Sequence, residues 1–224
     1  MHINLSQILD LERLHNLIVV NRDIMIRTLC LIFAFAWFTN EGAKFGDVTL
    51  AANAILMQLV TFSAFFLDGF ALAAETLVGA AVGAKNRGQF DKAVRLSSEL
   101  ALATSFCLSI IFYISGSWII RLMSNVSTVQ DKADEYLIWV ILAPLMSVWC
   151  YLLDGVFIGA TRTVEMRNAM IVSLSGFLAA WYLSQELLWQ SAQNHGLWAS
   201  LTFYFVVRAL TLNYYLPGLR RSLG

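Results

Sequence analysis

The stretch YLIWVILAPLMSVWCYLLDGVFIGA (residues 136–160) carries one charged side chain, Asp154, in an otherwise apolar run. A helix needs about 20 such residues to cross a hydrocarbon core of about 30 Å. We therefore interpret this stretch as a membrane-spanning helix. The question that it raises is why a carboxylate lies within it.

The composition extends this interpretation to the whole chain. Hydrophobic residues make up 58% of the 224, charged residues 13%, and the formal net charge is zero. Soluble domains contain about 25% charged residues. The sequence therefore predicts an integral membrane protein whose surroundings are the lipid bilayer, and the absence of a basic patch argues against a nucleic-acid partner.

Six apolar segments predict an all-α bundle of six transmembrane helices within a domain of residues 23–217. Residues 1–22, with apolar residues at helical spacing, predict an amphipathic helix on the cytoplasmic side, and residues 218–224 a cytoplasmic tail. The second segment is too long for an upright span, so we expect it to tilt, bend at Gly69 or project into the cytoplasm. The predicted segments are 24–43, 48–80, 94–121, 135–160, 166–187 and 196–216.

The distribution of basic residues predicts the orientation. If the N-terminus is cytoplasmic, most of the 15 Lys and Arg residues fall in the N-terminal segment, the second and fourth connections and the C-terminal tail. The positive-inside rule then places both termini in the cytoplasm. We expect a multi-pass protein of the cytoplasmic (inner) membrane.

Charged residues inside the predicted helices are the candidate functional groups. The tripeptide Leu-Asp-Gly occurs in FFLDGFALAAE (65–75) and YLLDGVFIGAT (151–161), which place Asp68, Glu75 and Asp154 within apolar runs. An ionised side chain at the bilayer centre costs at least about 2.5–3.5 kcal/mol, so it normally faces a bundle interior or a wet cavity. These three acids are candidates for ion coupling or substrate binding. The alternative is that one of them pairs with Arg208, the candidate structural counter-charge, and locks the bundle.

Small and kinking residues accompany these acids. The glycine after each Asp lets a neighbouring helix approach closely or lets its own helix bend. Pro144 removes one backbone hydrogen bond and favours a kink, with either a functional or a purely structural meaning. Trp149 lies near Asp154 on the same helix, where it either packs or flanks a cation.

Enzymatic chemistry has no support in the sequence. Cys30, Cys107 and Cys150 stand singly in apolar segments, and no metal-ligand spacing, phosphate loop or nucleophile–base motif occurs. We predict no enzyme activity, no metal and no cofactor, only a transported proton or sodium ion.

Three blocks resemble a known family of transporters. YLIWVILAPLMSVWCYLLDGVFIGATRTVEMRNAM (136–170), NRDIMIRTLCL (21–31) and TFSAFFLDGFALAAETLVGAAVGA (61–84) are similar to the second half of the DinF branch of the multidrug and toxic compound extrusion (MATE) family. Its members consist of two six-helix lobes that exchange a small organic cation or drug-like solute for protons or sodium by alternating access. The resemblance implies that this chain corresponds to the C-terminal lobe only.

The resemblance also carries implications for the site. Asp154 matches an acidic residue on the fourth helix of this lobe that is implicated in cation coupling in the sodium-linked branch. Its partner acid, on the first helix of the lobe, has no equivalent here, because TLCLIFAFAWF is uncharged and Glu41 lies at the outer end. Proton coupling is therefore favoured over sodium. The implied partner is a missing N-terminal lobe or a second half-transporter.

Two alternatives stay open at the sequence level. In the first alternative, the chain is half of a lipid-linked substrate flippase. That function would need more cationic residues facing the cavity than the lone Arg208. Otherwise it is a non-transporting truncated remnant or a membrane scaffold. That alternative predicts instability on expression alone, because a single lobe exposes a surface made for its partner.

Overall fold

The computed structural model describes residues 11–187 and 193–223, and within these ranges it consists of six α-helices joined by turns. This confirms the all-α bundle. Each predicted segment lies inside an observed helix, except that the segment 135–160 extends one residue beyond the end of its helix. The helices are longer than the predicted spans because polar residues extend their ends. They are α2 (Leu11–Ala43), α3 (Asp47–Gly83), α4 (Arg87–Met123), α5 (Ser127–Gly159), α6 (Thr163–Leu187) and α7 (Gln193–Arg221).

Two of the domain boundaries expected from the sequence fall in continuous helix. Residues 1–10 of the expected amphipathic helix lie outside the described residues, and the chain from Leu11 onward continues without a break into α2. At the other end, α7 continues to Arg221, within the expected tail. The membrane side on which these ends lie stays a prediction.

Short connections make consecutive helices antiparallel. After α3 the amide of Asn86 bonds to the carbonyl of Ala81 (2.9 Å), and after α5 the amide of Arg162 bonds to the carbonyl of Phe157 (2.9 Å). Both turns end the helix with the same bond pattern, in which a residue with positive φ satisfies the last carbonyls. Asn86 also caps α4, because its side chain accepts from the amide of Gln89.

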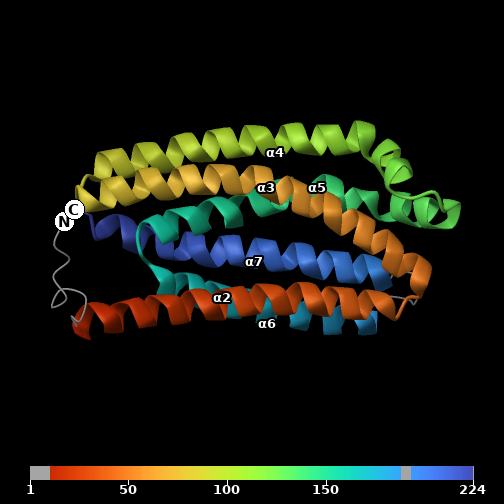
Figure 1. Ribbon diagram of the computed structural model, residues 1–224, viewed down its shortest axis with the longest axis horizontal. Coiled ribbons are helices and arrows are strands. Elements are labelled where there is room, and N and C mark those ends of the chain that lie inside the picture. Colours follow the sequence, from red (N-terminus) through yellow and green to blue (C-terminus); the bar gives the residue numbers. More distant parts are fainter. Residues whose placement is uncertain (1–10, 188–192, 224) are drawn as a thin grey trace, which may run out of the picture.

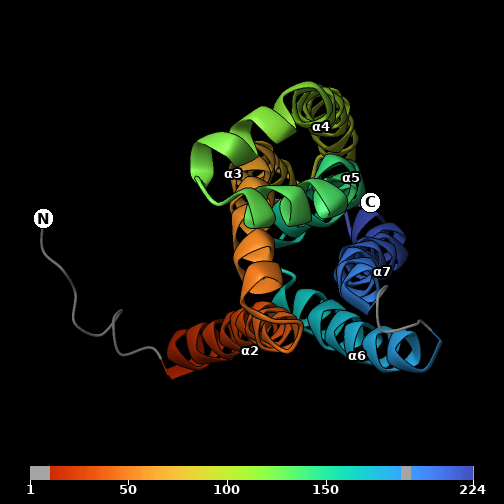
Figure 2. The same ribbon diagram turned by 90° about the vertical axis from the view of Figure 1, so that its right-hand side faces the viewer.

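The helices form two groups that α5 and α7 join. α3, α4 and α5 pack on one another, α6 packs on α2 and α7, and the contact of α5 with α7 connects the groups. Figure 1 shows α2 beginning and α7 ending at the same end of an elongated bundle, and Figure 2 shows the two groups end on. α3 changes direction along its length and leans toward α2 at the end where it begins.

α3 and α5 approach each other closely where they cross, and two glycines of α5 explain why. A Cβ atom on Gly155 would collide with the backbone carbonyl of Ala71, and one on Gly159 with that of Glu75. Two glycines four residues apart thus let the two backbones touch, as small-xxx-small motifs do in membrane helices. Gly69, the glycine of the other Leu-Asp-Gly, has no neighbour within 4 Å of such a Cβ.

The outer surface of the bundle is apolar, as contact with lipid requires. α3, α4 and α5 are each long and apolar enough to span a membrane. Large hydrophobic side chains point outward along the bundle, among them Phe65 (71% exposed) and Ile114 (75%). Soluble monomers rarely expose contiguous apolar surface on this scale. The protein is therefore a membrane protein.

Candidate functional site: a carboxylate between two arginines

Asp154 lies at the centre of the bundle, where three helices meet. Its side chain is 6% exposed, and its Oδ2 forms ion pairs with Arg27 of α2 and Arg208 of α7. Arg208 is 2% exposed and Arg27 22%. We call Arg27, Asp154 and Arg208 the central triad. It connects helices from both halves of the bundle.

The local sequence explains why Asp154 is buried so deeply. Residues 152–157 are all buried, because Gly155 admits α3 on one side of α5 while α7 covers another. A buried ion costs several kcal/mol unless it is paired and hydrogen-bonded. The two guanidinium groups supply that pairing.

The central triad has more positive than negative charge. Two guanidinium groups share one oxygen of one carboxylate, which leaves a surplus of one positive charge. Asp154 Oδ1, Arg27 Nε and Arg208 Nε are buried and have no hydrogen-bond partner among the described residues. Buried polar atoms of native proteins are almost always paired. The central triad therefore has buried hydrogen-bond donors and an acceptor that no other described group of the chain pairs with.

The other acids expected from the sequence lie outside the central triad. Asp68 is exposed and Glu75 half-buried on α3, and within the described structure their side chains form no hydrogen bond or ion pair. The backbone of Glu75 is in contact with α5, because Gly159 packs against it. Pro144 is buried near the middle of α5, ten residues before Asp154. The functional roles of these residues stay predictions.

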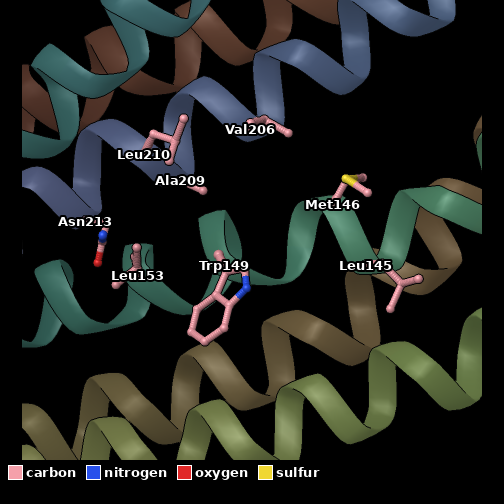
Figure 3. Close-up of a pocket in the computed structure, with 8 residues that line it drawn as sticks. All are labelled: Leu145, Met146, Trp149, Leu153, Val206, Ala209, Leu210 and Asn213. Carbon is pink, nitrogen blue, oxygen red and sulfur yellow. The ribbon is translucent and has the colours of Figure 1, made fainter.

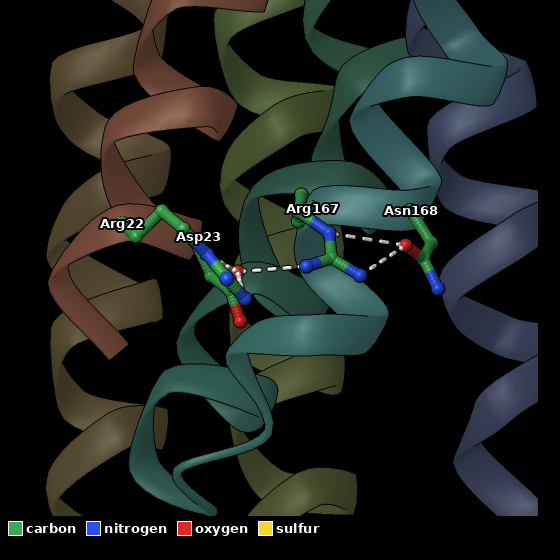
Figure 4. A network of polar contacts seen from close by, with 4 residues as sticks. All are labelled: Arg22, Asp23, Arg167 and Asn168. Carbon is green, nitrogen blue, oxygen red and sulfur yellow. Dashed lines mark hydrogen bonds and ion pairs between the residues drawn. The ribbon is translucent and has the colours of Figure 1, made fainter. Parts of the chain in front are cut away.

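A second buried carboxylate joins α2 to α6. Asp23 is fully buried, and its Oδ1 accepts from Arg167 Nη1 of α6 (2.8 Å) and from Arg22 on its own helix (3.2 Å). Figure 4 shows Arg167 reaching Asp23 on one side and Asn168 on the other. Like Asp154, Asp23 is flanked by two arginines.

A polar network joins α3 to α7 near the end where both helices begin. The side-chain amides of Asn53 and Asn194 bond to each other (2.8 and 3.1 Å), and Trp198 Nε1 donates to Asn53 Oδ1 (2.9 Å). Beside it, Trp139 Nε1 of α5 donates to His195 Nδ1 (3.0 Å). All three side chains of the amide network are buried and mutually satisfied, so it acts as a structural lock.

An apolar groove of about 510 Å³ lies between α5 and α7. Figure 3 shows side chains of α7 opposite those of α5, with Trp149 between Leu153 and Leu145 along α5 and Asn213 near one end. Trp149 is 43% exposed. The lining residues are Leu145, Met146, Trp149, Leu153, Val206, Ala209, Leu210 and Asn213.

Arg27 and Asp23 are the site residues that the sequence reasoning passed over. Arg27 counted there only as one of the basic residues near the inner membrane surface. A signal was present, because Arg27 lies inside the expected span 24–43 and one helical turn after Asp23, so both point toward the same side of α2. Within the described structure, no cluster of three or more His, Cys, Asp or Glu side chains could hold a metal ion.

Comparison with families of known proteins identifies a family model that covers most of the chain. The model of the MatE family matches residues 24–183. The chain is also 43% identical over 196 residues to DNA damage-inducible protein F of Escherichia coli (strain K12), covering 88% of this chain and 42% of that protein. It thus spans less than half the length of this curated relative.

Solved structures share the fold. The Vibrio cholerae MATE transporter VcmN in its bent form superposes with a TM-score of 0.82 at 17% identity, over 99% of this chain and 49% of that one. A transporter of the MOP superfamily from Pyrococcus furiosus, whose binding pocket is described as having reverse polarity, gives 0.78 at 15% identity, over 90% and 44%. In both cases about half of a longer chain carries the six helices described above.

Proposed function

Because the chain belongs to the MatE family of membrane transporters, we propose that it acts as one six-helix lobe of a secondary active efflux antiporter. The family is one of transporters and not of enzymes. A lobe of this kind exports a small organic solute in exchange for protons when it is paired with a second lobe. The family assignment supports the class of activity, and the central triad supports the placement of the site.

The central triad is the observation that carries the proposal. It is a carboxylate paired with two guanidinium groups and buried between two groups of helices, and charged side chains within the membrane mark ion and substrate pathways. Its ion pairs to α2 and α7 connect the two halves of the lobe, so a change in the charge of Asp154 alters the packing between them. Alternating access needs such a two-state contact.

Protons are the favoured coupling ion. Hard metal cations take several oxygen ligands, whereas the ion-paired oxygen of Asp154 is already held by two guanidinium groups. A proton needs one oxygen only, and Asp154 Oδ1 has no hydrogen-bond partner among the described residues. The proposed site of action is the cytoplasmic membrane, with both ends of the chain on its inner side. The expectation that the solute is an organic cation stays a prediction.

The proposal is tested by replacing Asp154 in a paired transporter. This chain is substituted for the matching part of the E. coli relative, and proton-driven efflux of ethidium, a cation, and fluorescein, an anion, is measured in everted vesicles. We expect Asp154→Asn to lower efflux by about tenfold or more, because the charge that links three helices is lost. Protein level measured in the same membranes corrects for folding.

Asp131→Asn is the matched control, because Asp131 is exposed on α5 far from the central triad. We expect it to leave efflux unchanged. Efflux by Asp154→Asn equal to that of the control, at equal protein level, would remove Asp154 from the transport mechanism.

Arg27 gives specific support to a second candidate, a half of a lipid-linked substrate flippase. That function requires cationic residues beyond Arg208, and the structure places Arg27 beside it on the same carboxylate. A flippase would translocate a phosphate-bearing lipid without exporting either dye. Translocation of a fluorescent anionic lipid between bilayer leaflets distinguishes the two functions.

A further inference from the structure

We infer that the central triad is a binding site for one anionic group, a carboxylate or a phosphate, of the transported solute. The inference deepens the proposed function by naming the chemistry of the solute. It rests on the charge and hydrogen-bond balance of the triad, and its test is a binding measurement that does not depend on transport.

The first step is the charge balance. Arg27 and Arg208 both contact the same oxygen of Asp154, so two positive charges lie close together around one negative charge. An unpaired charge in a protein interior costs several kcal/mol. A second anion placed between the guanidinium groups removes that cost. A cation placed there adds a third positive charge.

The second step concerns the hydrogen bonds. Nε of Arg27 and Nε of Arg208 are buried N–H donors without an acceptor among the described residues. A guanidinium group presents its N–H donors as a planar fork that matches a carboxylate or a phosphate. The donors left over by Asp154 are thus of the type that binds these anions.

The third step excludes the nearest internal candidate. Asp68 of α3 is the carboxylate of the other Leu-Asp-Gly motif. It is exposed, however, and it forms no ion pair with Arg27 or Arg208 in the described structure. Among the residues that the structure describes, Asp68 therefore does not neutralise the surplus charge by direct contact.

Access to the site runs over Arg27. Its side chain is 22% exposed, whereas Asp154 and Arg208 are 6% and 2% exposed. An anion that reaches the exposed part of Arg27 meets the guanidinium group that is least tightly enclosed. Arg27 is therefore the residue that receives the anion, while Arg208 stays with Asp154 as the fixed pair.

The test measures ligand-dependent thermal unfolding of the full chain, purified in an uncharged detergent at constant ionic strength. The probes are benzoate for a carboxylate, inorganic phosphate for a phosphate, and tetraethylammonium as the cation. The variants are Arg27→Gln and Asp154→Asn, with Arg22→Gln as the matched control, since Arg22 lies on the same helix with its side chain 52% exposed.

The anion site predicts opposite effects of the two variants. Arg27→Gln weakens benzoate or phosphate binding by about tenfold, because one charged donor is lost. Asp154→Asn strengthens it by about tenfold, because the competing internal anion is gone. Arg22→Gln leaves the affinity unchanged. The tighter-binding probe decides between a carboxylate solute and a phosphate-bearing one.

Three outcomes would overturn the inference. One is tetraethylammonium stabilising the wild-type chain more than either anion, with the effect lost in Asp154→Asn. The second is Arg27→Gln binding both anions as tightly as Arg22→Gln. The third applies if Asp154→Asn unfolds on purification. The anion site then predicts a higher yield of folded protein in benzoate or phosphate buffer than in tetraethylammonium buffer. Equal yields in these buffers would contradict the site. Loss of transport with binding intact would contradict only the proposed function.

Discussion

At the scale of single residues, two charged side chains of α2 reach neighbouring helices. Asp23 and Arg27 lie one turn apart, yet each belongs to a different cluster: Asp23 joins α2 to α6, and Arg27 joins it to α5. Each cluster combines one buried carboxylate with two arginines. α2 is therefore joined by ion pairs to two helices, α5 and α6, although much of its surface is exposed.

Asp23 should be among the residues most sensitive to neutralisation. Breaking a buried ion pair by removing one partner costs about 3–5 kcal/mol, because the other charge is left unpaired. We expect Asp23→Asn to lower the free energy of unfolding by an amount in that range, since Arg167 loses its carboxylate. Equilibrium unfolding in mixed micelles measures it.

Glu99→Gln provides the comparison for Asp23. Its pair with Arg95 is exposed on α4, with side chains 56% and 79% accessible, and exposed pairs contribute about 0–1 kcal/mol. An equal loss in the free energy of unfolding in both variants would show that the burial of Asp23 does not strengthen its ion pair.

At the scale of elements, the contact of α3 with α5 depends on glycine. A Cβ at residue 159 would overlap the backbone of Glu75, and backbone cannot move aside as a flexible side chain can. We expect Gly159→Ala to separate the two helices and to cost about 1–3 kcal/mol, the usual range for overpacking. Thermal unfolding of the purified variant checks this.

Gly69→Ala is the matched control on α3. Its Cβ would meet no atom within 4 Å, and Ala is the better helix former by about 1 kcal/mol. Stability should stay level or rise. A larger loss at Gly69 than at Gly159 would contradict the packing account.

The contrast between these two glycines shows how far the sequence alone reaches. The number and order of the helices follow from hydropathy and turn residues, because both depend on local composition. Their lengths do not, because polar residues extend the helices beyond the apolar spans. The two Leu-Asp-Gly motifs look alike in sequence, yet Asp154 is buried between arginines and Asp68 is exposed. That difference depends on which face of each helix meets a neighbour. Tertiary packing decides this, so Arg27 emerged as a site residue only from the structure.

At the scale of the whole molecule, the orientation in the membrane is open to direct measurement. In a background without Cys30, Cys107 and Cys150, single cysteines are placed at Asn86 and at Ser124, in turns at opposite ends of α4. We expect a membrane-impermeant maleimide to label residue 124 in spheroplasts and residue 86 only after lysis, because the turn at 84–86 and its flanks are rich in basic residues. The reverse labelling pattern would invert the proposed topology.

The chain spans less than half of its E. coli relative, and its described residues form one set of six helices. The match of the MatE model shows its family, and the solved structures share its fold. Transport needs a cavity that opens alternately to the two sides, and in our proposal this cavity forms between two lobes. The central triad then acts from within one of them.

The most direct test of this proposal is proton-driven efflux by the chain alone and by the chain co-expressed with the N-terminal half of the E. coli relative. Both preparations are compared in everted vesicles at matched amounts of inserted protein. We predict efflux that follows the imposed pH gradient only when both halves are present. Equal efflux by the chain alone, or none by an inserted and assembled pair, would contradict the account.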